Sequence, residues 1–300
     1  MRVLIDLFGI QIYLSNLKGL TQPSLVFPGV TCCNLSIKHE HWFNMPTINF
    51  HGEDIEYQDH GQGPVFVLIP GLGGRLAFWQ GVVPALSQSF RVIALDHPMT
   101  VIGPDAIQDM ADLVLVLLDH LGIAQCSVVG QSMGGPVAQR IALGHPHRVK
   151  RIVFSSTWAG PDDYFRRSFG LRAEILENQG VEGYAKAQIL STFSPEDIAN
   201  NPERAATWEK RTIETSDPTV LAHRMRAILA HDATDRIQEI THPCLVIAVN
   251  GDQVVPPHMS RNLARNLPNA QLKELTGGGH FKAMLDPDGY VAALKPFLNI

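Results

Sequence analysis

The sequence passes repeatedly from short strand-like runs, most of them largely apolar, to longer segments in which apolar residues recur at helical spacing. The runs are typical of strands buried on both faces of a parallel sheet. They lie at residues 65–69, 91–96, 126–131, 151–155, 244–249 and 271–275. The segments with helical spacing lie at residues 78–86, 106–121, 133–143, 257–266 and 287–297. Strands that alternate with helices predict a mainly parallel sheet with helices on both faces.

Two regions depart from this alternation. Residues 48–57 alternate between polar and apolar around Gly52, which predicts an antiparallel hairpin. From about residue 158 to residue 240 no strand-like run occurs, and the pattern is helical. The helical pattern is interrupted at one glycine and three prolines, which are Gly180, Pro195, Pro202 and Pro218. This region therefore predicts a helical insert.

These patterns divide the chain into three parts. We predict an α/β core at residues 45–156 and 236–300, a helical cap at residues 157–235, and an N-terminal extension of uncertain order at residues 1–44. The extension begins fairly apolar, but one aspartate and two prolines interrupt it, which argues against a membrane span. Only one basic residue precedes the apolar part, and no clear cleavage site follows. We expect a cytoplasmic protein, with export as the alternative that this extension leaves open.

The composition narrows the class of protein. With 45% hydrophobic and 18% charged residues, the chain of 300 residues is typical of a soluble globular protein. Its net charge of −5, without a run of Lys and Arg, argues against a nucleic-acid partner. The four cysteines form no disulfide framework or zinc pattern. The histidines at 39 and 41 lack the spacing of the H-E-x-x-H metal motif, so we predict neither a metal nor a cofactor.

A candidate nucleophile lies between a predicted strand and a predicted helix. Residues 130–134 read Gly-Gln-Ser-Met-Gly, a G-x-S-x-G pattern. A serine on such a corner has a strained backbone and presents its hydroxyl at the end of the sheet. The glycines are needed because a Cβ at Gly130 or Gly134 would collide with the neighbouring strand or helix. We predict that Ser132 is a nucleophile, the alternative being a tight structural turn.

A serine nucleophile needs a base, usually a histidine that a carboxylate orients. In a parallel sheet the chemistry gathers at the carboxyl ends of the strands. His280 follows three glycines after the run at 271–275, and Asp252 follows the run at 244–249. Ser132, Asp252 and His280 thus occur in the chain order described for Ser-Asp-His hydrolases. The structural alternatives are a turn cap for His280 and an ordinary surface turn for Asp252.

Attack on an acyl carbon creates an oxyanion that needs N–H donors placed in advance. The backbone N–H of Met133, directly after Ser132, is one candidate. Residues 70–74, Pro-Gly-Leu-Gly-Gly, follow the run at 65–69, and their glycines permit close backbone approach. We predict the N–H of Leu72 as the second donor. A phosphate-binding loop is the rival interpretation, but the G-x-x-x-x-G-K-[ST] pattern is absent from the sequence.

The loop at 70–74, the motif at 130–135, Asp252 and residues 279–280 together resemble the α/β-hydrolase superfamily over residues 46–300. The resemblance implies an α/β-hydrolase fold, with a mostly parallel eight-stranded sheet flanked by helices and a helical cap over the site. The family's first loop usually begins with His-Gly, and Pro70 replaces that histidine here. Since the donor is a backbone group two residues later, the oxyanion hole is expected to persist.

Within the superfamily the sequence is most similar to 3-oxoadipate enol-lactonases and related small esterases. Residues 130–139, 179–196 and 215–218 carry this similarity. The chain departs from that pattern at residues 96–100, where Asp-His-Pro-Met-Thr replaces the family's usual Arg-Gly-x-Gly-x-Ser loop. Because that loop lines the substrate pocket in the relatives, the substrate stays open.

Two groups of cap residues are candidates for contacting a substrate. The aromatic candidates are Trp158, Tyr164, Phe165, Phe169 and Trp208, and we assign Trp158 and Phe165 to substrate binding. For these rings as a group, the favoured interpretation is that they form the insert's own core. The basic candidates for holding a carboxylate are Arg166, Arg167, Arg224 and Arg226. For these arginines a solvated basic face is the favoured interpretation.

These features predict a serine hydrolase that cleaves a small-molecule carboxylic ester or lactone. Haloalkane dehalogenases and epoxide hydrolases of this superfamily use an Asp nucleophile, which the serine at position 132 disfavours. Carbon–carbon bond hydrolases and cofactor-free haloperoxidases share the Ser triad and stay open as alternatives. A non-catalytic binding protein on this fold is less favoured, because such proteins often lose a triad member.

Overall fold

The computed structural model describes residues 3–7, 10–14, 45–103 and 105–299. It divides into two units, Met1–Phe43 and Asn44–Ile300. In the first unit β1 (Val3–Leu7) pairs antiparallel with β2 (Ile10–Leu14). The sequence pattern predicted no element there, and the rest of the extension lies outside the described residues. All that follows concerns the second unit.

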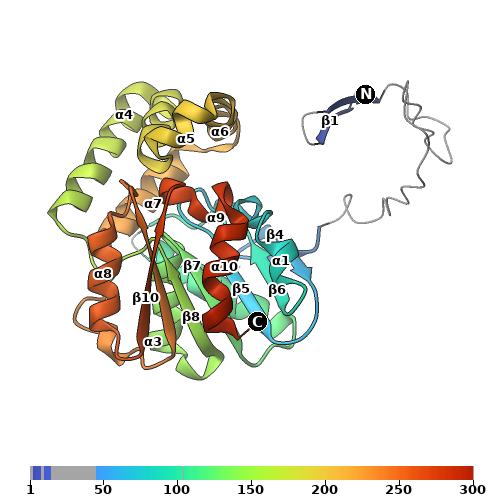
Figure 1. The fold of residues 1–300 in the computed structure, drawn as a ribbon. Coiled ribbons are helices and arrows are strands. Elements are labelled where there is room, and N and C mark those ends of the chain that lie inside the picture. The colour runs from blue at the N-terminus through green and yellow to red at the C-terminus, as the bar shows by residue number, and fades with distance from the viewer. Residues whose placement is uncertain (1–2, 8–9, 15–44, 104, 300) are drawn as a thin grey trace. The chain divides into compact units, whose positions relative to one another are not determined.

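The second unit is built on one eight-stranded sheet in the order β10-β9-β8-β7-β5-β6-β4-β3 (Figure 1). Its strands are β3 (Thr47–Phe50), β4 (Glu53–His60), β5 (Val65–Ile69), β6 (Arg91–Leu95), β7 (Cys126–Gln131), β8 (Val149–Ser155), β9 (Cys244–Asn250) and β10 (Ala270–Thr276). The six strands from β10 to β6 run parallel, and β4 and β3 add antiparallel pairs at one edge. The predicted hairpin is therefore confirmed, as is the mainly parallel sheet.

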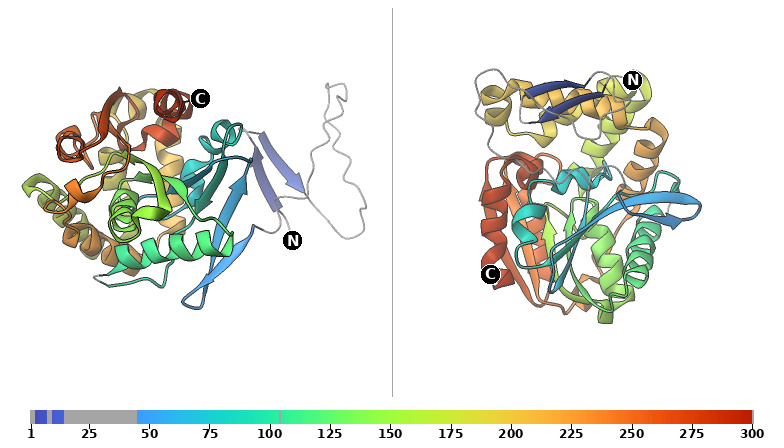
Figure 2. Two further views of the ribbon diagram at one scale, coloured as in Figure 1. Left: turned by 90° about the horizontal axis from the view of Figure 1, so that it is seen from below. Right: turned by 90° about the vertical axis from the view of Figure 1, so that its right-hand side faces the viewer.

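Helices cover both faces of this sheet. They are α1 (Val83–Leu86), α2 (Ala106–His120), α3 (Gly134–Gly144), α8 (Pro257–Asn266), α9 (Lys282–Leu285) and α10 (Pro287–Leu298). Short 3₁₀ turns lie at η2 (Leu76–Trp79), η3 (Pro146–Arg148), η4 (Ile237–Glu239) and η5 (Gly279–Phe281). The left view of Figure 2 shows α2 and α10 on opposite sides of the sheet. None of the helices in the described residues is long and apolar enough to cross a membrane.

The two faces of the sheet belong to two separate apolar clusters, because successive side chains of a strand point to opposite faces. On β5, Val67 and Ile69 join the cluster with α2, α3 and α8. Phe66 and Leu68 of the same strand join the cluster with α1 and α10. The sheet is thus held in place by an apolar cluster on each face.

Cys126 and Cys244 are free and buried, and burial raises the pKa of each thiol to about 12.

One predicted helix does not form as a single element. Residues 78–86 divide into the end of η2 and the short α1, with a turn between them. Gly81 lies in this turn, and Pro84 lies in the first turn of α1. Proline has no N–H to donate within a helix, and glycine weakens a helix interior. These two residues explain why the amphipathic pattern is not realised as one helix.

Four helices lie between β8 and β9, at one end of the sheet (Figure 1). They are α4 (Asp163–Thr192), α5 (Pro195–Asn200), α6 (Pro202–Thr215) and α7 (Pro218–Ala230). Three of them begin with a proline, which is favoured at a helix start because its missing N–H would have no partner there. Gly180 interrupts α4 with a φ of 66°. We call this segment, residues 157–235, the helical insert.

Candidate active site

Ser132 lies at the corner between β7 and α3, and its side chain is buried at the end of the sheet. Its φ is +53°, a left-handed conformation that L side chains rarely adopt. A Cβ at Gly130 would lie 2.3 Å from the carbonyl oxygen of Gly134, and one at Gly134 would lie 2.4 Å from that of Ile69. The corner therefore has room only for glycine on both sides of the serine.

Neighbouring backbone holds this strained corner in place. The Ser132 N–H donates to the carbonyl oxygen of Ser155 at 2.9 Å, which ties the corner to the end of β8. The hydroxyl of Thr157 donates to the carbonyl oxygen of Ser132 at 2.8 Å. A Cβ at Gly135 would lie 2.1 Å from that same Thr157 oxygen. The Thr157 hydroxyl thus occupies the space that a side chain at position 135 would need, and it stabilises the corner by its hydrogen bond. The sequence pattern did not indicate this role.

Asp252 and His280 meet in the structure as predicted from their places after β9 and β10. His280 Nδ1 lies 2.8 Å from Asp252 Oδ2, and both side chains are buried. The other oxygen of Asp252 accepts the N–H groups of Val254 and Val255, each at 2.9 Å. The carboxylate is therefore fixed from both sides, so that one oxygen always faces the imidazole.

The loop before His280 depends on three glycines. Gly277, Gly278 and Gly279 all have positive φ, at 71°, 77° and 54°. Gly278 donates its N–H to Asp197 of α5 at 3.0 Å, and a Cβ at Gly279 would lie 2.6 Å from the carbonyl oxygen of Thr192. The histidine loop consequently packs directly against the helical insert.

The second ring nitrogen of His280 faces the corner that carries Ser132. Its present neighbour is the side-chain amide of Gln131, whose Nε2 lies 3.2 Å from His280 Nε2 and 3.3 Å from the His280 carbonyl oxygen. In the described residues no hydrogen bond joins Ser132 Oγ to the imidazole, although both line one cavity. Gln131 is a neighbour of the histidine that sequence reasoning missed, because the G-x-S-x-G pattern leaves the residue before the serine unspecified.

Residues 70–74 follow β5, whose last residue Ile69 is level with Gly130 of β7. This register sets the loop beside Ser132, and a Cβ at Gly71 would lie 3.1 Å from Ser132 Cβ. The carbonyl oxygen of Gly71 accepts the N–H of Gly74 at 2.9 Å. This bond fixes the peptide plane that also carries the Leu72 N–H. The loop therefore holds this N–H in one orientation beside the serine.

His97, from the loop after β6, supports the same segment. Its Nε2 lies 2.9 Å from the carbonyl oxygen of Pro70, so this nitrogen carries the hydrogen. Burial, reinforced by the positive charge of Arg224, lowers the pKa of His97 to about 3. His97 is accordingly a neutral donor that holds the loop and belongs to the segment 96–100 that departs from the enol-lactonase pattern.

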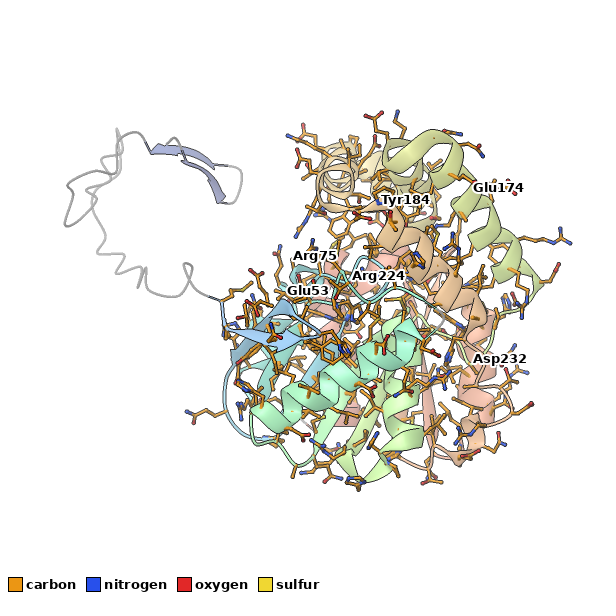
Figure 3. All side chains as sticks on the ribbon, turned by 180° about the vertical axis from the view of Figure 1, so that it is seen from behind. Glu53, Arg75, Glu174, Tyr184, Arg224 and Asp232 are labelled. Carbon is orange, nitrogen blue, oxygen red and sulfur yellow. The ribbon has the colours of Figure 1, made fainter. Side chains whose placement is uncertain are left out.

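Arg224 does not lie on a solvated basic face, which corrects the interpretation favoured from the sequence. Its side chain is only 2% exposed and projects from α7 onto the loops after β5 and β6. Nη1 donates to the carbonyl oxygen of Leu72 at 2.9 Å, and Nη2 donates to those of Pro98 at 3.0 Å and His97 at 3.3 Å. Figure 3 labels Arg224 at the level of Arg75 and Glu53, whose charges both act on it. Arg166, Arg167 and Arg226 are exposed, as predicted.

A cavity with an empty volume of about 810 Å³, its open mouth included, lies between these loops and the insert. Ser132, Gln131, His280 and residues 70–75 form its floor. The insert contributes Arg172, Tyr184, Gln188, Thr192 and Leu221, together with the segment of α6 around Trp208 and Arg211. The size and the mixed lining are those of a small-molecule site.

Trp158 and Phe165 are not among the residues that line this cavity. Both side chains are fully buried in the core cluster, with ring centroids 4.6 Å apart, and Phe165 packs in turn against the tilted ring of Phe169. The apolar surface they offer is taken up by packing between the insert and the core. Trp208 is the one aromatic candidate from the insert that reaches the cavity.

Arg172 is a cavity residue that the sequence did not single out. It shares one helical face of α4 with Phe165, Phe169 and Leu176, all of which are buried. This helical spacing could have indicated from the sequence that Arg172 is buried. An arginine in such a pattern is, however, normally taken as the end of the apolar face.

No group of three or more His, Cys, Asp or Glu residues suited to binding a metal occurs in the described part of the chain.

Comparison with known proteins places this architecture in a family. A family model described as the alpha/beta hydrolase fold matches residues 64–287. A Stutzerimonas stutzeri protein named as a carbamate hydrolase, RutD, is 36% identical over 247 residues, which cover 79% of this chain and 93% of that protein. A Caulobacter vibrioides protein with the same name is 34% identical over 259 residues, which cover 82% of this chain and 96% of that protein.

A solved structure supports the same placement. The enol-lactonase from Burkholderia xenovorans LB400 matches with a TM-score of 0.78 at 27% identity, and the match covers 85% of this chain and all of that one. The match of the family model over most of the chain agrees with the sheet order and with the strained serine corner. The chain therefore belongs to the α/β-hydrolase fold family.

Proposed function

We propose that this protein is a serine hydrolase that cleaves a carboxylic ester or lactone through an acyl-enzyme. The observation that carries the proposal is the buried Asp252–His280 hydrogen bond of 2.8 Å, in a cavity that also presents Ser132 on its strained corner. A carboxylate, an imidazole and a serine in this relation form the constellation that activates a hydroxyl.

The proposed reaction begins when Ser132 Oγ attacks the carbonyl carbon and gives its proton to His280 Nε2. Asp252 Oδ2 accepts the Nδ1 hydrogen and stabilises the imidazolium. The C–O bond to the leaving alcohol then breaks, and His280 returns the proton to that oxygen. A water molecule attacks the acyl-enzyme by the same proton path in reverse, which releases the acid and restores Ser132.

Before the first step, His280 Nε2 has to change its hydrogen-bond partner from the Gln131 amide to the Ser132 hydroxyl. Gln131 donates to this nitrogen in the present structure, and the Ser132 hydroxyl takes its place when substrate is bound. Catalytic hydrogen bonds often tighten only in the substrate complex. The proposed oxyanion donors are the N–H groups of Leu72 and Met133, and the helical insert acts as the cap that shields the reaction from water.

The relatives support hydrolysis of a carbonyl compound and also widen the set of substrates to test. The solved neighbour is an enol-lactonase, and the sequence relatives are named as carbamate hydrolases. A carbamate carbonyl is open to the same attack by a serine. We infer an acyl-transfer hydrolase whose leaving group is an alcohol, an enol or a carbamate oxygen or nitrogen.

The test is a hydrolysis screen of lactones, esters of increasing chain length and carbamates with the purified protein. Replacing the nucleophile in Ser132→Ala should lower kcat on any accepted substrate by at least about 10³-fold. Ser127→Ala, a buried serine on the same strand outside the cavity, serves as the matched control and should keep its activity. Retained turnover in Ser132→Ala refutes the proposal. A fluorophosphonate probe should label the unsubstituted chain and not the Ser132→Ala variant.

A further inference from the structure

Arg172 is a buried charge at the wall of the cavity. Its side chain is 6% exposed, and its guanidinium lies over the rings of Phe169 and Tyr184, at 4.8 Å and 5.5 Å from their centroids. Nη2 donates to the hydroxyl of Tyr184 at 3.1 Å. Two aromatic faces and one hydroxyl thus hold the group in a single orientation.

Most of the donor capacity of this guanidinium is unused. Nε and Nη1 are buried and have no hydrogen-bond partner among the described residues. No carboxylate there lies within 4.0 Å of the group either, so its charge has no ionic partner in that part of the chain. A buried charge with unused donors costs free energy unless another group compensates it. Arg172 lines the cavity, so a bound molecule is able to supply that compensation.

The other arginines of the lining are Arg75 and Arg211, and no Asp or Glu is among the lining residues. Arg75 is paired with Asp96, whose Oδ2 lies 2.9 Å from Arg75 Nη1, so Arg211 is the one that adds to the charge of Arg172. Arg211 lies over the ring of Trp208 at 5.6 Å, and the indole N–H of Trp208 is a second buried donor without a partner in the described residues. A low-dielectric cavity lined by one sign of charge concentrates ligands of the opposite sign.

We propose that Arg172, assisted by Arg211 and the Trp208 N–H, forms an anion subsite that recognises a carboxylate on the substrate. The proposal rests on the proposed function for the idea that the bound molecule is a substrate. It adds the substrate class: a small acyl compound that carries a negative charge besides the bond that is cleaved. An uncharged aliphatic ester fills the same cavity without satisfying the guanidinium.

Binding tests the subsite without any need for turnover. The probe is succinate, titrated calorimetrically into the full-length Ser132→Ala protein, with its neutral diamide, succinamide, as the matched ligand. We expect succinate to bind at least tenfold more tightly than succinamide. The reason is that a hydrogen bond between two charged groups raises the affinity about tenfold or more over a bond to a neutral group. Equal affinity for the two, or no succinate binding, overturns the proposal, and neither outcome depends on any change at Arg172.

Substitutions then locate the site. Arg172→Gln, made in the Ser132→Ala background, should weaken succinate binding about 10- to 100-fold. Arg166→Gln on the same helix, where the side chain is exposed, should leave the affinity within twofold. An unchanged affinity in Arg172→Gln, or an equal loss in Arg166→Gln, contradicts the assignment. If Arg172→Gln does not fold, as judged by circular dichroism, Arg211→Gln is the second variant, with an expected loss of at least threefold.

Kinetics connects the subsite to the reaction. Ethyl hydrogen succinate and ethyl butyrate present similar acyl chains with and without a carboxylate, and a pH-stat follows both. Selectivity for the charged ester in kcat/KM should exceed tenfold and should fall at least tenfold in Arg172→Gln, mainly through KM. If the protein binds succinate but hydrolyses no acyl compound, the proposed function fails and the subsite stands. If it hydrolyses esters but does not bind succinate, only the subsite fails.

Discussion

Three histidines of the described residues are buried, and their surroundings differ. His280 has a carboxylate on one ring nitrogen and an amide on the other. His97 and His231 instead face neutral oxygens, the Pro70 carbonyl at 2.9 Å and the Gln139 side chain at 2.8 Å. Of these three histidines only His280 forms a hydrogen bond to a carboxylate, the kind of partner that a general base requires when it takes a proton.

His97 and His231 are expected to make the fold sensitive to acid. Burial is the main cause that lowers the pKa of His97 to about 3 and that of His231 to about 4, from an ordinary 6.5. Between pH 6.5 and 4 the unfolded chain therefore binds protons that the folded chain does not. The free energy of unfolding should fall with decreasing pH across this window, by about 1.4 kcal/mol per pH unit for each histidine.

Urea denaturation at several pH values between 7 and 4.5 measures this slope. His97→Gln keeps a side-chain N–H for the Pro70 carbonyl and removes one titrating group, so its slope should be smaller by about one proton. His120→Gln, at an exposed position on α2, should keep the slope of the unsubstituted protein. Identical slopes in all three proteins would mean that His97 binds a proton in the folded state.

At the scale of elements, the loop after β5 is held by groups from two other parts of the chain. His97 arrives from the loop after β6, and Arg224 arrives from α7 of the insert. They fix the carbonyl groups of Pro70 and Leu72, on either side of the peptide that carries the Leu72 N–H. Helix α7 of the insert and the proposed oxyanion hole are thus mechanically connected, although Arg224 itself does not line the cavity.

Removing this connection should impair the chemical step more than substrate binding. In Arg224→Ala, kcat on any accepted ester should fall about tenfold or more with KM changed little, because a donor displaced by about 1 Å stabilises the oxyanion poorly. Free guanidinium at millimolar concentration should restore part of kcat by occupying the vacated position. Arg226→Ala, exposed on the same helix, is the control and should keep its kcat. A loss of kcat that tracks thermal stability alone, without rescue, would reduce Arg224 to a structural residue.

At the scale of the whole molecule, the core and the insert share one cavity, whereas Met1–Phe43 is a separate unit. The sheet, both apolar clusters and every residue of the proposed site lie within Asn44–Ile300. All the described residues to which the proposed activity is assigned therefore lie in the second unit.

A chain that begins at Met45 should accordingly fold and remain active. We expect its thermal midpoint to stay within about 2 °C of the full-length value, and its ester turnover to stay within twofold. Differential scanning fluorimetry and the hydrolysis assay measure the two quantities on matched samples. A lower midpoint or a large loss of turnover would assign the first 44 residues a structural part in the enzyme.

Much of the fold was predictable because it depends on local patterns. The apolar run at 65–69 becomes β5, and the prolines at 195, 202 and 218 mark the starts of three insert helices. The pattern at 78–86 was wrong as a helix, since Gly81 and Pro84 outweigh the amphipathic spacing there. The strands β1 and β2 had no pattern that predicted them.

The sequence by itself determined which residues lie at the ends of strands, and so which side chains were candidates for chemistry. Chain order and glycine placement were enough to name Ser132, Asp252 and His280 as candidates, because strand ends in a parallel sheet meet at one edge. Only the tertiary structure decided what each side chain touches. Arg224 is buried through hydrogen bonds to the loops after β5 and β6, which are far away in the chain. Arg172, Trp158 and Phe165 are buried as well, and neither of the two rings lines the cavity. The physical reason is that backbone preference is local, whereas the burial of a charge or a ring depends on which distant loops converge around it.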